Sequence, residues 1–371
     1  MLTLEMLPAK NGDCLWIEYG PPGDRRRLLI DGGTRATYGG LRERIEALPP
    51  DERTFELLVV THVDNDHVDG IVRLLQNPQL GFCFKDVWFN GWRHLGDPGD
   101  DVLGPVQGEY LAARITNKRL SWNRHFEKSA VVVPPEQELP RIPLAGGLQL
   151  VLFSPAPAEL TRLRGKWIDV VTDVEKDYPD PGSTADWLRR FDRDRRYRPD
   201  DDFDDALGPE RPPNVEKLLE VKFEPDDAEA NGSSIAFLLE YGGVRCLLGG
   251  DAHAPVLEAS VRRYLAEEAL LKLPLDAFKV PHHGSKKNVS KGLLDLLQCR
   301  RFLISTNSSV HRHPDDESVA RIVAYGGRDK ELVFNYRVRQ TEKWDDPRLA
   351  RKYHYRTRYP PAGREGVPVE L

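Results

Sequence analysis

One short segment constrains this chain more than any other: a run of metal-binding side chain types directly after an apolar stretch. Leu57–Val60 has the composition of a buried strand, and residues 61–70 then read Thr-His-Val-Asp-Asn-Asp-His-Val-Asp-Gly. A tight turn from strand to helix points alternate side chains into one pocket, where histidine nitrogens and carboxylate oxygens bind divalent metals. The pattern predicts a metal centre rather than a polar turn with an aspartate helix cap. The predicted ligands are His62, Asp64, Asp66 and His67.

Two later strand ends carry side chains of the same kind. Asp251 follows the apolar stretch Val244–Leu248 and two glycines that permit a close backbone approach, so its carboxylate is placed to bridge two metal ions. After the apolar stretch Ala277–Val280 come His282 and His283, of which one would bind metal and the other would be its neighbour, a proton donor or a phosphate contact. Read alone, Asp251 is better explained as a turn residue, and the histidine pair can lie on the surface. Together with the first segment, they predict three loops that converge on one centre.

The order of the predicted elements favours a mixed α/β fold in one large domain over residues 1–371, rather than two small domains. Hydrophobic periodicity predicts strands over 2–7, 14–19, 27–30, 57–60, 86–89, 148–153, 234–241, 244–248, 277–280, 301–305 and 331–335, and helices over 40–47, 68–75, 254–269, 291–298 and 318–325. We expect a long insertion over approximately 90–230, of which 165–230 is the most charged part, and a basic, aromatic tail over 345–371.

The composition excludes several classes of protein. The formal net charge of −6 gives no global basic footprint for nucleic acid or for an anionic membrane. The four cysteines are far apart, which indicates neither a zinc ribbon nor a disulfide scaffold and favours a reducing compartment. Because neither a signal sequence nor a run of ~18 apolar residues is found, we expect a cytoplasmic protein without membrane contact.

Four motifs occur in an order that resembles the metallo-β-lactamase superfamily. They are Asp31-Gly32-Gly33, His62 to His67, Leu247 to Asp251 and Val280 to Ser285. Within the superfamily, the chain is similar to the branch that includes the hydrolase domain of the competence protein ComEC, over residues 1–90 and 231–325. The resemblance implies an αββα sandwich of the metallo-β-lactamase type with a long charged insertion. Its metals would be held by loops at one edge of two facing sheets.

The resemblance also implies two divalent metal ions, zinc or manganese, and assigns their ligands. The first ion would be held by His62 and Asp64, and the second by Asp66, His67 and His282, with Asp251 bridging both. His282 is favoured over His283 because it comes first after the strand, which leaves His283 at the mouth of the site.

The chain departs from the superfamily pattern at two places. Asp64 stands where a histidine is usual, and residues 231–234 lack a further histidine that is usual before the bridging aspartate. The first metal site is therefore poorer in nitrogen, which weakens it or shifts it toward harder ions such as manganese. The similar branch shares the Asn/Ser segment, in which Asn231 or Ser233 would contact a phosphate oxygen or form a turn into the next strand.

Further polar residues are candidates for the pocket. Ser285 and His313 would contact substrate, although a packing role in a loop explains His313 equally well. Ser285 lacks the Gly-x-Ser-x-Gly elbow of a serine nucleophile, so a metal-bound hydroxide is the better nucleophile. His94 and His125 are the remaining substitutes for the missing ligand, and we expect both to be structural.

The predicted function is metal-dependent hydrolysis of a phosphodiester, by a phosphodiesterase or nuclease. Two ions clamp the attacking and leaving oxygens of an in-line displacement, and Asp66, His283 and Asn231 are the expected catalytic side chains. One alternative is a hydrolase of a cyclic nucleotide, phosphocholine-type ester, thioester or lactone. Another is a partner-regulated effector subunit, for instance in phage defence, that binds protein through the charged insertion. The tyrosines of the tail would stack on single-stranded nucleic acid or dock the C-terminus.

Overall fold

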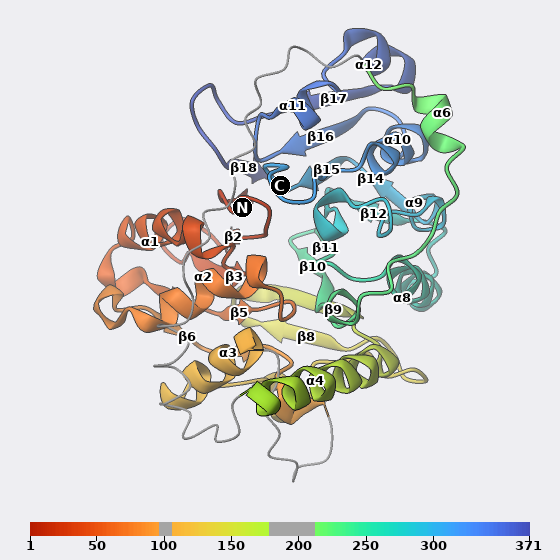
Figure 1. Ribbon diagram of the computed structural model, residues 1–371. Coiled ribbons are helices and arrows are strands. Elements are labelled where there is room, and N and C mark those ends of the chain that lie inside the picture. The colour runs from red at the N-terminus through yellow and green to blue at the C-terminus, as the bar shows by residue number, and fades with distance from the viewer. Residues whose placement is uncertain (96–105, 178–211) are drawn as a thin grey trace.

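The computed structural model describes residues 1–95, 106–177 and 212–371. This part of the chain contains two large β-sheets that share one buried core and carry helices on their outer sides (Figure 1). The predicted αββα sandwich is confirmed. Much of the most charged part of the predicted insertion, over 178–211, lies outside the described residues.

The first sheet has six strands in the order β18-β1-β2-β3-β5-β7. Their bounds are β1 Leu2–Met6, β2 Leu15–Tyr19, β3 Arg26–Ile30, β5 Leu57–Val59, β7 Val87–Trp88 and β18 Val367–Glu370. Strands β18, β1, β2 and β3 pair antiparallel, whereas β3, β5 and β7 are parallel. A separate parallel pair joins β4 (Thr54–Phe55) to β6 (Cys83–Phe84).

The second sheet has eight strands in the order β17-β16-β15-β13-β11-β10-β9-β8. Their bounds are β8 Arg141–Leu144, β9 Leu148–Ser154, β10 Ala236–Tyr241, β11 Val244–Leu248, β13 Ala277–Lys279, β15 Arg301–Ile304, β16 Lys330–Phe334 and β17 Tyr355–Arg358. Strands β11, β13, β15, β16 and β17 are parallel, so their carboxyl ends gather at one edge. The short parallel pair β12 (Leu273–Leu275) and β14 (Leu297–Cys299) forms a small sheet of its own.

Helices cover the outer faces of both sheets (Figure 1). On the first sheet lie α1 (Tyr38–Glu46), α2 (Asn65–Gln76), α3 (Val106–Asn117) and α4 (Pro157–Asp177). On the second lie α8 (Ala254–Glu267), α9 (Lys291–Asp295) and α10 (Asp316–Tyr325), and the short helices are α6 (Val215–Leu219), α7 (Glu229–Gly232), α11 (Arg339–Glu342) and α12 (Pro347–Tyr353). Among the described helices, none combines the length and the apolar composition that a membrane span needs.

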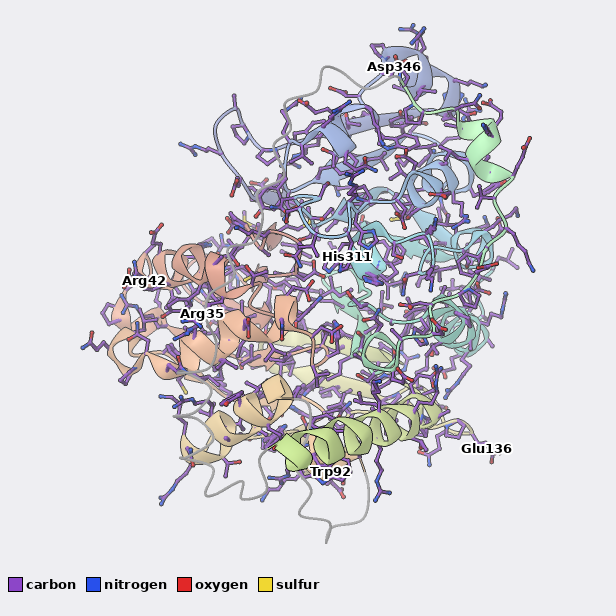
Figure 2. The ribbon with its side chains drawn as sticks, viewed as in Figure 1. Arg35, Arg42, Trp92, Glu136, His311 and Asp346 are labelled. Atoms are coloured by element: carbon purple, nitrogen blue, oxygen red, sulfur yellow. The ribbon has the colours of Figure 1, made fainter. Side chains whose placement is uncertain are left out.

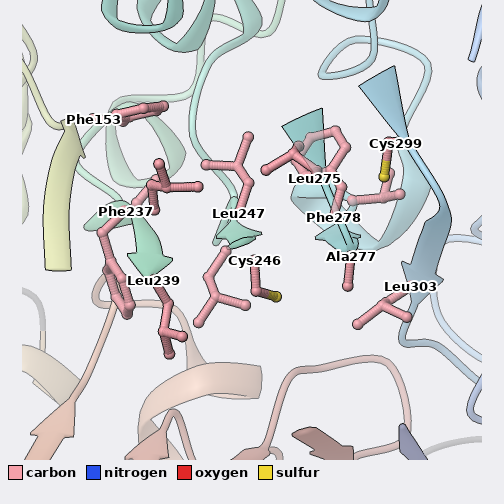
Figure 3. Close-up of a cluster of buried hydrophobic side chains, with 14 of the residues drawn as sticks. Phe153, Phe237, Leu239, Cys246, Leu247, Leu275, Ala277, Phe278, Cys299 and Leu303 are labelled. Carbon is pink, nitrogen blue, oxygen red and sulfur yellow. The ribbon is translucent and has the colours of Figure 1, made fainter. Parts of the chain in front are cut away.

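Alternating side chains on the strands build the two cores. Leu28 on β3 and Leu57 on β5 belong to the core between the sheets, whereas their chain neighbours Leu29 and Leu58 belong to the core beneath α1, α2 and α3. Successive side chains of a strand point to opposite faces, so an apolar run is buried on both. Figure 3 shows the same alternation in the second sheet, where Cys246 and Leu247 point away from one another.

Segments of the predicted tail and insertion complete both sheets, and of their strands only β9 matches a predicted strand, over 148–153. The predicted tail over 345–371 contributes β17 to the second sheet and β18 to the first, and residues 141–154 of the predicted insertion form β8 and β9. Tyr355 is buried, and its hydroxyl donates a hydrogen bond to the Trp344 carbonyl over 2.7 Å. These contacts favour the docked C-terminus over a tail that stacks on single-stranded nucleic acid.

Candidate metal centre

Helix α2 carries two of the predicted ligands in its first turn. The helix begins at Asn65 rather than at residue 68 as predicted, so Asp66 and His67 project from helical backbone. A Cβ on Gly70 would lie 1.8 Å from the Gly32 carbonyl oxygen, so this contact requires glycine. The close approach lets the Gly32 N–H donate to the His67 carbonyl over 2.9 Å. The first turn is thereby fixed against the loop that follows β3.

Buried acceptors orient the imidazoles of His62 and His67. Asp31 Oδ2 lies 2.7 Å from His67 Nδ1 and accepts a hydrogen bond from Thr61 Oγ1 over 2.8 Å. Since the Thr61 hydroxyl gives its proton to Asp31, it acts as acceptor toward His62 Nδ1, which lies 3.0 Å away. This pattern places the proton of each ring on Nδ1. With this proton on Nδ1, each ring can offer its Nε2 lone pair to a metal ion at the centre.

The loop after β13 holds its histidines in a strained backbone conformation. His282 and His283 have φ angles of 48° and 52°, in the left-handed region that costs a non-glycine residue about 1–3 kcal/mol. The His282 N–H donates to the Gly250 carbonyl over 3.0 Å, and the Ser285 N–H donates to the His282 carbonyl over 2.7 Å. These bonds hold the turn against the loop that carries Asp251.

The two rings of this loop are anchored differently. His283 Nδ1 donates to the Ser305 carbonyl over 3.0 Å, and the side chain is only 3% exposed. His282 Nδ1 lies 3.0 Å from Asn288 Oδ1 and 3.3 Å from Asp226 Oδ2, and its side chain is 21% exposed. Because each Nδ1 is engaged by an acceptor, both Nε2 atoms are again left as ligands.

Asp251 lies in the middle of these rings. Its carboxylate faces four nitrogens: Oδ2 is 3.9, 3.8 and 3.7 Å from Nε2 of His62, His282 and His283, and Oδ1 is 3.6 Å from Nε2 of His67. The carboxylate follows β11 of the second sheet, whereas His62 and His67 come from the first. The centre is therefore built where loops of both sheets meet.

Two further carboxylates border the same centre. Asp64 Oδ2 lies 3.5 Å from His62 Nε2, and Asp66 Oδ2 lies 3.5 Å from His283 Nε2. Ligand atoms come within 4.8 Å of one another in three groups that share His67: with His62 and Asp251, with Asp66 and His283, and with Asp13 and Asp31. All of the predicted metal ligands thus gather around Asp251.

Several buried polar atoms at the centre have no hydrogen-bond partner within the described structure. They are His62 Nε2, His67 Nε2, His283 Nε2 and Asp251 Oδ1. Native proteins satisfy nearly all buried polar atoms, so four exceptions that face one another need an explanation. Imidazole nitrogens with free lone pairs and a carboxylate oxygen are a donor set for Zn²⁺ or Mn²⁺. The residues present therefore fit a divalent metal.

The charges of the cluster also favour a cation at the centre. Burial alone would raise the pKa of Asp66, but His67 and His283 lower it to about 2. Burial also opposes the shift at Asp251, yet the nearby histidines hold its pKa well below the usual value. At His283 burial lowers the pKa, whereas Asp251 and Asp13 raise it to about 10. The carboxylates thus favour positive charge at the centre, which a divalent cation supplies.

The structure groups Asp66 with His283, whereas the sequence-based assignment grouped it with His282. The expected exposure is also reversed, because His283 is buried and His282 lies at the mouth beside His313, with 5.2 Å between their ring centroids. The ring centroid of His311 lies 5.8 Å from that of His313, and Figure 2 shows His311 near the middle of the view. His282 and His283 both have left-handed backbone, which turns the ring of His283, rather than that of His282, into the interior.

The remaining predicted contacts are engaged within the protein. Asn231 Nδ2 donates to Asp226 Oδ2 over 2.7 Å, so Asn231 supports the partner of His282. Ser233 Oγ donates to a carbonyl of α7 over 2.6 Å, as expected for a turn into the next strand. Ser285 Oγ accepts a hydrogen bond from a backbone N–H of its own loop over 3.3 Å. None of these three bonds points to a substrate.

His94 and His125 have structural partners, as expected. His94 Nδ1 accepts from the Gly91 N–H over 3.2 Å, and its ring lies 4.6 Å from that of Trp122. His125 Nδ1 lies 2.9 Å from Asp86 Oδ2. Neither histidine belongs to the metal-type clusters found among the described residues.

Four buried residues that sequence reasoning missed support the cluster. Lys279 Nζ donates to Asp13 Oδ2 over 2.6 Å, and Asp13 Oδ1 lies 3.5 Å from His283 Nδ1. Asn288 Nδ2 donates to Asp226 Oδ2 over 3.1 Å. Asp13 stands in a turn motif and Asp226 in a charged run, so neither forms a metal-type pattern. A lysine inside an apolar strand was the one available signal, because a buried cation needs an acidic partner.

Comparisons with known proteins find likeness only among solved structures. No family model and no curated protein matches the chain, whereas 42 solved chains do. The metallo-β-lactamase fold protein YhfI from Bacillus subtilis is 10% identical, with a TM-score of 0.39 over 100% of this chain and 99% of that chain. Zn²⁺-bound PqqB from Methylobacterium extorquens (13% identical, TM-score 0.41) and human tRNase Z, short form (9%, 0.40), also span 100% of this chain, and 100% and 99% of their own. Likeness of this degree carries no argument about chemistry, which rests on the geometry of the cluster.

Proposed function

We propose that this protein is a metal-dependent hydrolase that acts on phosphodiesters, as a phosphodiesterase or a nuclease. One observation carries the proposal: four buried ligand atoms without hydrogen-bond partners, on three histidines and Asp251, face a common centre. Asp64 and Asp66 border the same centre and add two carboxylates. The donor set is therefore large enough for two divalent ions.

The distances favour a division of the ligands that differs from the sequence-based one. Asp66, His67 and His283 would hold one ion, because their ligand atoms already lie within 4.8 Å of one another. The other ion would be held by His62, Asp64 and His282, with Asp251 shared between the two. In this arrangement His282 replaces the histidine that is missing from residues 231–234, and the first site gains a second nitrogen.

Two bound divalent ions would activate water and neutralise charge on the attacking and leaving oxygens of a phosphodiester. The protein's own contribution is to hold the ligands in place. Asp31 and the Ser305 carbonyl keep the Nδ1 protons of His67 and His283 turned away from the centre. His313, whose ring lies next to His282, borders the mouth through which a substrate would approach.

The ligand chemistry favours a phosphodiester over a thioester or a lactone. Three carboxylates converge on the centre, and oxygen ligands suit hard divalent ions that bind phosphate oxygens well. A shared carboxylate between two ions is also the arrangement expected for an in-line displacement at phosphorus.

The test combines metal analysis with hydrolysis assays. Substrates would be bis-p-nitrophenyl phosphate, a cyclic dinucleotide, and single- and double-stranded nucleic acid. The native chain would be compared with Asp66→Ala/His67→Ala and with Asn65→Ala, an exposed neighbour on the same helical turn. We expect bound metal and phosphodiester hydrolysis to disappear together in the double variant and to persist in Asn65→Ala. Bound metal without turnover of any phosphodiester would contradict the proposal and favour one of the alternative functions.

A further inference from the structure

The edge of the second sheet opposite to the metal centre also carries a cluster of charged side chains. Asp251 and the histidine pair follow the carboxyl ends of β11 and β13, and the amino ends of the same parallel strands gather at the other edge. These strands have three to five residues, so the two edges are roughly 10–17 Å apart at ~3.3 Å per residue. A ligand at one edge would not touch the other.

A cavity of about 550 Å³ opens at this amino-terminal edge. Its size falls in the range of pockets for small molecules, about 300–1,000 Å³. Each of several neighbouring strands contributes an arginine at or beside its first residue. The arginines that line the cavity are Arg245, Arg300, Arg301, Arg328 and Arg356.

Nearby carboxylates hold two of these arginines, each through one guanidinium nitrogen among the described residues. Arg245 donates through Nε to Glu240 Oε1 over 2.9 Å, and Arg300 donates through Nη1 to Asp276 Oδ1 over 3.0 Å. Neither bond uses the whole planar fork, which offers five N–H donors. Both arginines line the cavity, so their remaining N–H donors lie at its wall.

The other side of the cavity has the same character. Arg301 and Arg356 share Glu331, with their Nε atoms 3.4 and 2.9 Å from its two carboxylate oxygens. Arg328 Nη2 lies 3.3 Å from Nδ1 of His354. Among the described residues, one carboxylate thus pairs with two guanidinium groups, and a third group is hydrogen-bonded to a histidine ring.

The lining has an excess of positive charge in a protein that is acidic as a whole. Five arginines face two aspartates, Asp276 and Asp329, in the lining, and the excess persists when Glu240 and Glu331 behind it are counted. The formal charge of the entire chain is −6, so this edge is a local exception. Arg300 and Arg356 remain accessible, at 78% and 70% exposure of their side chains.

We propose that this cavity binds a small molecule with two or more phosphate groups, such as a nucleoside diphosphate. Guanidinium forks match phosphate oxygens in geometry and stay charged, and several forks around one cavity suit several phosphates. Pro274, which is partly exposed, gives the same cavity an apolar wall on which a base can lie. The arginines converge on one hollow, which fits a small ligand better than a polymer.

Equilibrium binding to the full chain would test the site, with EDTA present so that the metal centre holds no phosphate. The probes are ADP, pyrophosphate and adenosine. We expect saturable binding of ADP and pyrophosphate but not of adenosine. R300Q/R356Q should weaken both by about tenfold for each lost charge-assisted contact. The control R348Q removes an equally exposed arginine on α12 that also pairs with an aspartate, and it should bind like the native chain.

The three probes and the two variants distinguish a phosphate-binding cavity from a polymer-binding surface. Equal affinity of ADP and pyrophosphate would show that the phosphates suffice, and tighter binding of ADP would place the base on the apolar wall. Equal affinity of the native chain and R300Q/R356Q would overturn the proposal, as would adenosine binding as well as ADP. Affinity that appears only with oligonucleotides and grows with their length would replace the proposal by a polymer-binding surface. Since EDTA removes metal from the metal centre, this binding test does not depend on whether the proposed hydrolase activity is found.

Discussion

The deep and the shallow walls of the metal centre fix their histidines in different ways. On the deep wall, His67 is held by Asp31 and His283 by a backbone carbonyl, and both side chains are almost fully buried. On the shallow wall, His282 is partly exposed and is held by a polar network around Asp226 and Asn288. The shortest contacts of the deep wall, of 2.7 and 3.0 Å, are buried, whereas the shallow wall offers the partly exposed His282 ring two acceptors that can compensate for one another. Substitutions should therefore be most costly on the deep wall.

The largest effect is expected where the two walls meet. Asp251→Asn removes the charge that faces four histidine nitrogens, so metal binding should fail on both sides. The rate of phosphodiester hydrolysis should fall by roughly a thousandfold, since several kcal/mol of transition-state stabilisation are lost at ~1.4 kcal/mol per factor of ten. Metal content by mass spectrometry and the hydrolysis rate measure the two effects. Retention of both would show that Asp251 is only a structural residue.

The second prediction compares the neighbouring histidines directly. His283→Ala should remove the ion that Asp66 and His67 also hold, whereas His282→Ala should weaken the other ion and leave this one in place. Metal stoichiometry after dialysis distinguishes the two variants, with circular dichroism as the check on folding. If His282→Ala instead loses the ion held by Asp66, the sequence-based assignment is right and the grouping by distance is wrong.

The main strands of the deep wall were predictable because their signals are local. Strands β5, β11 and β13 are short apolar runs, and each ends in a polar motif that differs sharply from the run before it. The start of α2 was misplaced because Asp66 and His67 were counted as turn residues. In the structure Asp64 is the N-cap of this helix, and its extended backbone marks the boundary.

The shallow wall could not be predicted, because its contacts join distant parts of the chain. Asp226 and Asn288 are 62 residues apart, and Asp226 stands in a charged run that has no distinguishing pattern. The inward turn of His283 depends on a left-handed φ and on a carbonyl at the end of β15. Neither feature leaves a trace in the spacing of residues. The closing strands β17 and β18 were missed for a similar reason, since proline, arginine and tyrosine dominate that part of the chain.

A third prediction concerns the support of the deep wall. Asp31 accepts from the Thr61 N–H at one oxygen, and from the Thr61 hydroxyl and His67 Nδ1 at the other. In Asp31→Asn one of these oxygens becomes an NH₂ group that faces a donor, so the contacts cannot all form. Metal affinity and hydrolysis should fall by about 10–100-fold, as for other partners of metal-binding histidines. Titration with Zn²⁺ or Mn²⁺ measures the loss of affinity. An affinity equal to that of the native chain would show that Asp31 does not support the centre.

The smallest effect is expected on the shallow wall. Asp226→Asn weakens one acceptor of His282 Nδ1, but Asn288 Oδ1 remains at 3.0 Å, so metal affinity should fall by no more than about tenfold. Asp227→Asn is the matched control, since its side chain is 85% exposed and, among the described residues, pairs with Lys287 at the surface. Metal titration of both variants beside Asp31→Asn places the two walls on one scale. A loss at Asp226 as large as that at Asp31 would show that the network does not compensate, and the distinction between the walls would then fail.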